Sequence, residues 1–377
     1  MRWPKTSVEN VRPSRFHPPF CPWNECESHQ GAPARFPGHG SYRTRSCARR
    51  IPRFRCTCCR RTCSRQTFST TYYLKKPHLL VRVAAGLAAC SAHRQIARSV
   101  RCAKTSVTRL AERLGRHAIL FQARCLRELS TIDESIVHDH FETFIGRQDR
   151  ALGIGTAVGS ESWFVYDVDP APHRGAGRRP DRQPERLKGS SPNTYVRSIR
   201  RAFSGLIERL FAGKLTFVVD GRADYRHALR DRRLADRAAL RVFPNPERGP
   251  KGSPRSPEAI ARDFAMFPVD QLHQLLRHTC ADHKRETIAF GRRLESILGR
   301  AHLIAVWKNF IKARSERRPD RSTPAMRLGL AQDPWSWERV LSRRLLLHRE
   351  PARETARKLY EKRWTSGLPE LSARQAG

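Results

Sequence analysis

The chain shows its clearest helical pattern between residues 76 and 128. Apolar side chains recur there every three or four positions, which places them on one face of a helix. A first helix begins near Leu79. Two more follow from residue 91 onward, with Ser91 as the predicted cap of the first and Val100 as the buried residue of the turn between them. This pattern predicts a helix-turn-helix domain over 76–128, although an ordinary helical hairpin would show much the same periodicity.

Residues 129–330 alternate between strand-like and helix-like patterns. Positions 136–146 alternate between apolar and polar residues, and 215–221 form a nearly continuous apolar run, as in a strand buried on both faces. Two further strand-like runs and a helical stretch lie between them, and residues 283–314 have the apolar stripe of one long helix or a pair of helices. We therefore expect an α/β domain in which helices flank a mixed sheet, interrupted by a flexible basic loop at 173–195.

The large positive charge of the chain indicates a negatively charged partner. The sequence has 73 Lys and Arg against 35 Asp and Glu, which gives a formal net charge of +38. Such an excess repels itself in a compact state unless it meets a polyanion, and nucleic-acid phosphate is the commonest polyanion. A solubilising surface, or an out-of-frame translation of GC-rich DNA, is the alternative explanation.

The apolar runs of the sequence are too short for a membrane protein. None reaches the roughly 18 residues that a membrane-spanning helix needs. The N-terminus lacks the apolar stretch and the small-residue cleavage site of a signal peptide. We therefore expect a cytoplasmic protein with no membrane partner. Its ends are expected to be a disordered tail at 1–15 and a C-terminal helical segment and tail at 331–377.

Seven of the eleven cysteines lie in the first 63 residues. Cys56 and Cys59 form a C-x2-C pair, and Cys21 and Cys26 form a wider C-x4-C pair. Two such pairs supply the four thiolates of a tetrahedral zinc site, whereas disulfides are rare inside the cell. The spacing predicts a zinc-ribbon-like element at 16–75 that binds one structural Zn²⁺. Reactive or incidental cysteines are the alternative, and three others offer alternative ligands: Cys47, Cys58 and Cys63.

The second helix of the predicted helix-turn-helix, at 103–114, has a polar face opposite its apolar stripe. Residues of this kind reach phosphates and base edges when a recognition helix lies in the major groove. We therefore expect this face to bind double-stranded DNA through Lys104, Thr105, Ser106, Thr108 and Arg109.

Three acidic residues are predicted to point inward. Asp139 shares a strand face with apolar residues, whereas Glu142 lies on the opposite face. Asp220 ends the apolar strand at 215–221. Glu286 lies four residues before Phe290 and so continues the apolar stripe of the predicted helix. A buried carboxylate is costly without a cation, and acids held together in this way bind divalent ions. Each acid alone could be an ordinary ion-pair residue. The neighbouring basic residues suit a nucleic-acid backbone: Arg285, Arg292 and Arg293.

These pieces together resemble a known family. The segments "CPWNEC", "RFRCTCCRRTCSRQTF", "DHFETFIG", "VVDGRADY" and "KRETIAFGRR" are similar to those of DDE transposases of bacterial insertion sequences, most of all the insertion sequence one family and its relatives. The resemblance implies an RNase H-like catalytic domain at 129–330. In it, Asp139, Asp220 and Glu286 would hold two Mg²⁺ (or Mn²⁺) ions.

The resemblance also implies an activity and its partners. The chain would bind the terminal inverted repeats of its element, cleave DNA strands in a metal-dependent reaction and transfer them into target DNA. It would act as a homo-oligomer on DNA, associated with the bacterial nucleoid. Two alternatives stay open: a non-catalytic DNA-binding regulator or inactive transposase copy, and an RNA-binding protein. Convergence of the acids would favour the enzyme, because neither alternative needs it.

Overall fold

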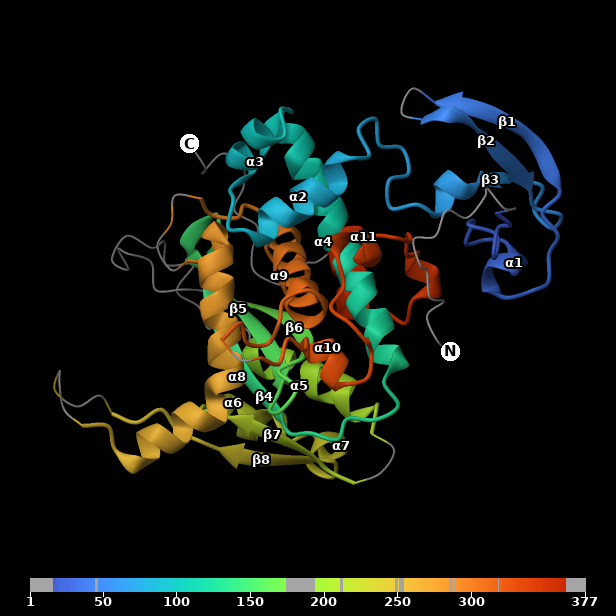
Figure 1. Cartoon of the computed structure of the whole chain (residues 1–377). Helices are drawn as coiled ribbons and strands as arrows, with labels where there is room; N and C mark the ends of the chain where they lie inside the picture. The colour runs from blue at the N-terminus through green and yellow to red at the C-terminus, as the bar shows by residue number, and fades with distance from the viewer. Residues whose placement is uncertain are drawn as a thin grey trace, which may run out of the picture. The chain divides into compact units, whose positions relative to one another are not determined.

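The computed structural model describes most of the 377-residue chain. The described residues are 16–44, 47–173, 194–210, 213–247, 250, 254–284, 287, 289–317 and 319–363. They belong to two compact units, one formed by Met1–His78 with Leu341–Arg349 and the other by Leu79–Val340 with Glu350–Gly377 (Figure 1). The predicted tail at 1–15, nearly all of the predicted loop at 173–195, and both Arg285 and Glu286 lie outside the described residues.

The first unit is built on a small antiparallel sheet with the strand order β1-β2-β3. Its elements are α1 (Glu27–Gln30), β1 (Gly38–Thr44), β2 (Cys47–Arg55), β3 (Thr62–Ser64), η1 (Arg65–Phe68) and η5 (Leu347–Arg349).

An aromatic cluster forms the core of this unit. The rings of Phe20 and Phe68 meet edge to face with centroids 5.3 Å apart, and Phe16 and Phe54 pack against them. Leu346 joins the cluster, so part of the predicted C-terminal segment belongs to this unit. The unit therefore has a second source of stability besides any metal, because aromatic side chains bury large apolar areas.

The second unit begins with the three helices predicted from the sequence: α2 (Leu79–Ala88), α3 (His93–Ser99) and α4 (Lys104–Glu128). Three details differ from the prediction. Ala92 and not Ser91 is the N-cap of α3, where the Ala92 N–H donates to the Gln95 side chain at 2.8 Å. Val100 is only half-buried. Finally, α4 continues well beyond residue 114, because its buried face extends through Phe121 and packs along a later helix, α9 (Leu294–Phe310).

A five-stranded mixed sheet forms the centre of the second unit. Its strands are β4 (Ile136–Ile145), β5 (Arg147–Gly159), β6 (Val165–Pro172), β7 (Leu215–Val219) and β8 (Ala238–Val242). They lie in the order β6-β5-β4-β7-β8. β4, β5 and β6 form an antiparallel meander, whereas β7 runs parallel to β4 and β8 parallel to β7. The predicted α/β class, with a mixed sheet flanked by helices, is confirmed.

Helices cover both faces of this sheet. On one face lies α5 (Thr194–Ile207), where the Phe203 ring stacks on Phe217 of β7 at 3.6 Å. On the other face lies α8 (Pro257–Thr279), and α9 (Leu294–Phe310) packs on β6 beside α4 (Figure 1). The shorter elements are α6 (Ala223–Ala228), α7 (Arg232–Ala235), η4 (Ala281–His283), α10 (Pro324–Arg327), α11 (Trp337–Val340) and α12 (Glu354–Glu361).

The predicted helix at 283–314 is wrong in its first third. α9 begins only at Leu294. His283 ends the 3-10 helix η4, and the other described residues between it and α9 are not helical. The reason is a tertiary contact: the Gly146 N–H, after the end of β4, donates to the Gly291 carbonyl at 2.8 Å and fixes this segment outside a helix. Phe290, predicted to lie in the buried stripe, is 37% exposed.

The helix α8 was not predicted. The Ser256 side chain caps it by accepting from the Ala259 N–H at 3.2 Å, and Pro257 occupies the first turn, where a missing N–H costs nothing. Figure 1 shows α8 bending along its length, and Pro268 inside the helix provides the cause. In the part of the chain that is described, no helix is both long and apolar enough to cross a membrane.

Candidate metal centres

Two tight turns carry the four predicted zinc ligands. The Cys26 N–H donates to the Trp23 carbonyl at 3.0 Å and closes the first turn. In the second, between β2 and β3, the Arg60 N–H donates to the Cys56 carbonyl at 3.0 Å, with Arg60 in the left-handed region at a φ of 62°. Each turn holds the two cysteines of one pair close together, Cys21 with Cys26 and Cys56 with Cys59.

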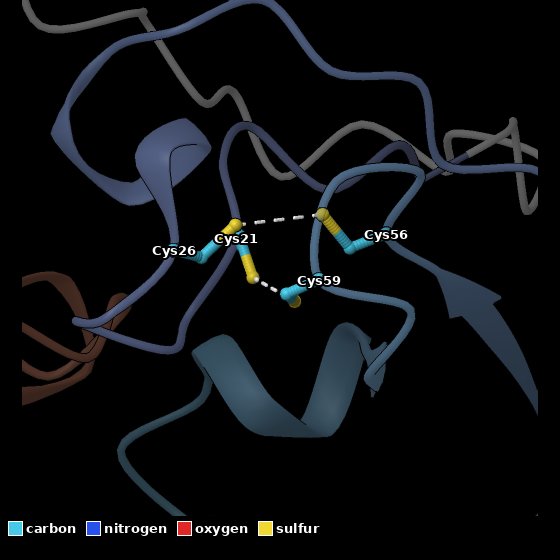
Figure 2. A group of neighbouring side chains, drawn as sticks. All are labelled: Cys21, Cys26, Cys56 and Cys59. Carbon is cyan, nitrogen blue, oxygen red and sulfur yellow. Dashed lines mark hydrogen bonds between the residues drawn. The ribbon is translucent and has the colours of Figure 1, made fainter.

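The four thiols converge, as Figure 2 shows. The Cys21 and Cys59 sulfurs lie 3.5 Å apart and those of Cys26 and Cys56 3.8 Å apart, and all four sulfurs lie within 4.8 Å of one another. A disulfide would need about 2.05 Å. Zn–S bonds of about 2.3 Å in a tetrahedron place sulfurs roughly 3.8 Å apart. This buried four-cysteine cluster can therefore hold a structural zinc ion.

The thiols of the cluster differ in how readily they ionise. Burial raises the pKa of Cys21. Burial also acts to raise the pKa of Cys56, but hydrogen bonds from the Cys59 and Cys58 backbones and from neighbouring thiols outweigh it and lower this pKa to about 7. Cys56 therefore supplies the thiolate, which is the form that binds a metal, more readily than an ordinary thiol does.

The alternative zinc ligands do not join this cluster. Cys63 lies in the aromatic core beside Phe20 and Phe68, and Cys58 is exposed to solvent. The side chain of Cys47 lies outside the described part of the chain. Among the described residues, the cluster therefore consists of the two pairs that the spacing predicted.

The predicted DNA-binding face of α4 is only partly open to solvent. Lys104, Thr105 and Arg109 are exposed, as are Arg292 and Arg293 before α9. The other two predicted residues of this face, Ser106 and Thr108, are half-buried. The Thr108 hydroxyl lies 3.1 Å from a ring nitrogen of His93 on α3.

The structure brings two of the three predicted acids together. Val137 of β4 pairs with Val218 of β7, and Asp139 and Asp220 each follow these paired residues by two positions, so their carboxylates are electrostatic neighbours. Burial and then the neighbouring Asp220 raise the pKa of Asp139 to about 7. Burial also raises the pKa of Asp220, although the Arg222 N–H donates to its carboxylate at 3.1 Å. Glu286, the third predicted acid, lies outside the described residues.

The predicted faces of β4 are confirmed. Glu142 accepts from the Tyr195 hydroxyl of α5, and a His140 ring nitrogen lies 3.3 Å from the Ser198 hydroxyl of the same helix. Asp139 instead lies on the opposite face, which α8 covers. Alternation along a strand explains this difference, because neighbouring side chains point to opposite faces.

Two further residues that could ligate a metal ion lie beside Asp139, and sequence reasoning missed both. Asp270 and His273 are three residues apart on α8, and their ligand atoms and that of Asp139 all lie within 4.8 Å of one another. The three residues line a pocket of about 510 Å³ together with Glu142, Gln274 and Arg277. The sequence did contain a signal, because Ser256 followed by Pro257 and Glu258 is typical of a helix start.

The short helix η4, which follows α8, is held against β4 next to this pocket. The Thr143 hydroxyl donates to the Asp282 carbonyl at 3.0 Å, and the buried His283 ring stacks on Phe141 at 5.6 Å. These contacts fix the position of α8 relative to the strand that carries Asp139. The distance between Asp139 and the α8 side chains is therefore set by packing on both sides of the pocket.

Comparison of the chain with protein-family models, curated proteins and solved structures finds no match. The function of the two centres therefore has to be inferred from their own chemistry.

Proposed function

We propose that this chain is a DDE-type transposase, which binds the ends of an insertion element and catalyses metal-dependent DNA strand cleavage and strand transfer. The observation that carries the proposal is the proximity of Asp139 on β4 to Asp220, which directly follows the parallel strand β7. The strand order β6-β5-β4-β7-β8, with three antiparallel strands and then two parallel ones, supports an RNase H-like catalytic domain.

The two acids have the chemistry of a divalent-cation site. Their oxygen ligands suit Mg²⁺ or Mn²⁺. The raised pKa of Asp139 supports this role, because burial and then a second carboxylate nearby disfavour ionisation until a cation compensates for them. A pair of bound ions would supply an activated water or 3′-hydroxyl and stabilise the leaving oxygen of a phosphodiester.

The cysteine cluster supports the DNA-binding part of the proposal. One Zn²⁺ at Cys21, Cys26, Cys56 and Cys59 would hold the turn between β2 and β3. Exposed arginines surround this turn, among them Arg55 and Arg60. A metal-fixed loop of arginines can contact phosphates without first losing conformational freedom. The zinc unit and the start of α4 would then bind double-stranded DNA, with the chain acting as a homo-oligomer on the nucleoid.

Strand cleavage of the element's own ends tests the proposal. The zinc-loaded chain is incubated with a DNA fragment carrying these ends and with Mg²⁺ or Mn²⁺, and nicked strands are resolved on a denaturing gel. Asp139→Asn and Asp220→Asn should each lower cleavage by several orders of magnitude while leaving end binding intact. The double variant should cost hardly more than either single one, since groups that act as a unit fail together.

Asp236→Asn is the matched control, because Asp236 is an exposed carboxylate that does not line the pocket. It should cleave at close to the wild-type rate. Cleavage by Asp139→Asn at that same rate would refute the assignment of the site. A wild-type chain that binds element ends but cleaves with neither ion would support the non-catalytic regulator instead.

A further inference from the structure

The side chains of Asp270 and His273 project from the same face of α8. Residues three apart on a helix are neighbours on its surface, so both meet Asp139 across the pocket. The His273 Nδ1 atom lies 3.8 Å from the Asp139 Oδ2 atom. That distance exceeds the roughly 2.7–3.2 Å of an N–H···O hydrogen bond, so no shared proton links the two groups.

A hydrogen bond on the far side of the ring explains which nitrogen faces the pocket. The Thr156 hydroxyl donates its single hydrogen to the Asp139 carbonyl at 3.3 Å, so it accepts from His273 Nε2–H at 2.8 Å. The Nδ1 atom of the neutral ring then carries a lone pair and no hydrogen. A lone pair and a carboxylate that face one another can both bind one cation, and metal-binding histidines are oriented by such hydrogen bonds from the other ring nitrogen.

A cation already contacts Asp270 in this structure. The guanidinium of Arg262, which lies before Asp270 on the same helix, donates to the Asp270 carboxylate. Its side chain is 15% exposed, so solvent screens this pair only partly. A metal ion would have to compete with Arg262 for Asp270.

We infer that Asp270 and His273 are ligands of the ion held by Asp139, and that their imidazole–carboxylate set selects Mn²⁺ over Mg²⁺. Imidazole nitrogen is a better ligand for transition-metal ions than for Mg²⁺, which prefers oxygen. The inference rests on the proposed function and deepens it, because it names ligands and a metal preference that the predicted acid trio does not include.

Mn²⁺ binding measured by electron paramagnetic resonance tests this assignment on the full, zinc-loaded chain without DNA. The hard Mn²⁺ ion is a poor match for the cysteine cluster, so the signal reports the acidic pocket. We expect a ¹⁴N coupling from imidazole in the wild type, and tighter binding of Mn²⁺ than of competing Mg²⁺. Asp270→Asn and His273→Gln should each weaken Mn²⁺ binding at least about tenfold, and His273→Gln should abolish the nitrogen coupling.

Three further variants make the test specific. His278→Gln changes an exposed histidine on the same helix and should leave Mn²⁺ binding unchanged. Arg262→Gln should tighten binding, because it removes the competing cation. His273→Asp should bind Mn²⁺ without nitrogen coupling and should bind Mg²⁺ nearly as well, which a purely structural role of His273 would not produce.

The outcomes separate this inference from the proposed function. A wild type without nitrogen coupling, or Asp270→Asn and His273→Gln chains that bind Mn²⁺ like His278→Gln, would overturn the ligand assignment even if the chain cleaves DNA. A chain that shows the expected metal binding but never cleaves element ends would support the ligand assignment and contradict the transposase proposal.

Discussion

The contact between α4 and α9 depends on two glycines. Gly115 of α4 lies against Gly299 of α9, and both are buried. A Cβ atom added to Gly115 would lie 2.8 Å from the Gly299 Cα, 3.0 Å from its carbonyl carbon and 3.1 Å from its oxygen. These are backbone atoms, which cannot rotate away. Gly115→Ala must therefore push the two helices apart.

The reverse substitution is milder and supplies a matched control. A Cβ atom on Gly299 would lie 3.3 Å from the Gly115 Cα and 3.8 Å from its carbonyl carbon. A shift of a few tenths of an ångström relieves that contact. Both substitutions remove a helix glycine, so both gain the same helix propensity of about 0.5–1 kcal/mol.

The net effect follows from these two terms. Overpacking of a dense core costs about 1–3 kcal/mol, and the backbone contact at Gly115 belongs at the upper end of that range. We expect Gly115→Ala to lower the free energy of unfolding by about 1–2 kcal/mol after the propensity gain. Gly299→Ala should change it by less than about 0.5 kcal/mol, because its smaller packing cost and its propensity gain offset each other.

Thermal unfolding followed by far-ultraviolet circular dichroism measures the difference, since nearly all described helix belongs to the second unit. At roughly 2–4 °C per kcal/mol, Gly115→Ala should lower Tm by roughly 2–8 °C. A Gly115→Ala chain as stable as the Gly299→Ala chain would show that α4 and α9 do not approach as closely as the structure has them.

Three further predictions concern the metal, the DNA and the pH. Cys56→Ser should release the zinc measured by elemental analysis and abolish end binding, yet leave the helical signal of the second unit intact. Arg109→Ala should weaken end binding and reduce the slope of log affinity against log salt by about 0.9, and an unchanged slope would count against a phosphate contact. Burial lowers the pKa of Lys308 from 10.5 to about 7, and the nearby charges of Arg314 and Lys312 add to this effect. Between pH 7 and 10.5 the unfolded chain therefore binds more protons at Lys308 than the folded chain does. Stability should therefore rise with pH by roughly 2 kcal/mol between about pH 7.5 and 9.5, and Lys308→Met should flatten this dependence in urea titrations.

The sequence predicts best where a local pattern and the tertiary environment agree. The alternation of β4 placed Asp139 and Glu142 on opposite faces, and the hydrogen bonds of Glu142 and His140 to α5 bear this out. The cysteine pairs were equally informative, because a ligand pair on a tight turn needs no distant contact to be recognised. In both cases the pattern that carries the prediction, one strand or one cysteine pair, is short and local in the sequence.

The prediction failed where distant contacts decide the structure. The apolar residues of α8 lie on both of its sides: Met266 and Leu272 are buried, whereas Phe264 is 80% exposed. No clean stripe therefore marks this helix, and Pro268 within it also argues against a helix in the sequence alone. Before the start of α9 the apolar stripe continues back through Phe290, which predicts a longer helix. The hydrogen bond from the Gly146 N–H to the Gly291 carbonyl instead holds this segment in a non-helical conformation.

Asp139 remains poorly compensated even though Arg262 contacts the neighbouring Asp270 and the chain has a net charge of +38. Charge acts on a buried group over short distances, since solvent screens arginines beyond roughly 8–10 Å at physiological salt. Arg262 is a cation that lowers the pKa of both Asp139 and Asp220, yet burial and the neighbouring carboxylate still raise that of Asp139. The surplus of positive charge elsewhere can therefore attract a polyanion without neutralising this pocket. A small divalent ion can enter the pocket and compensate the acids at close range, while the basic surface remains available for phosphate.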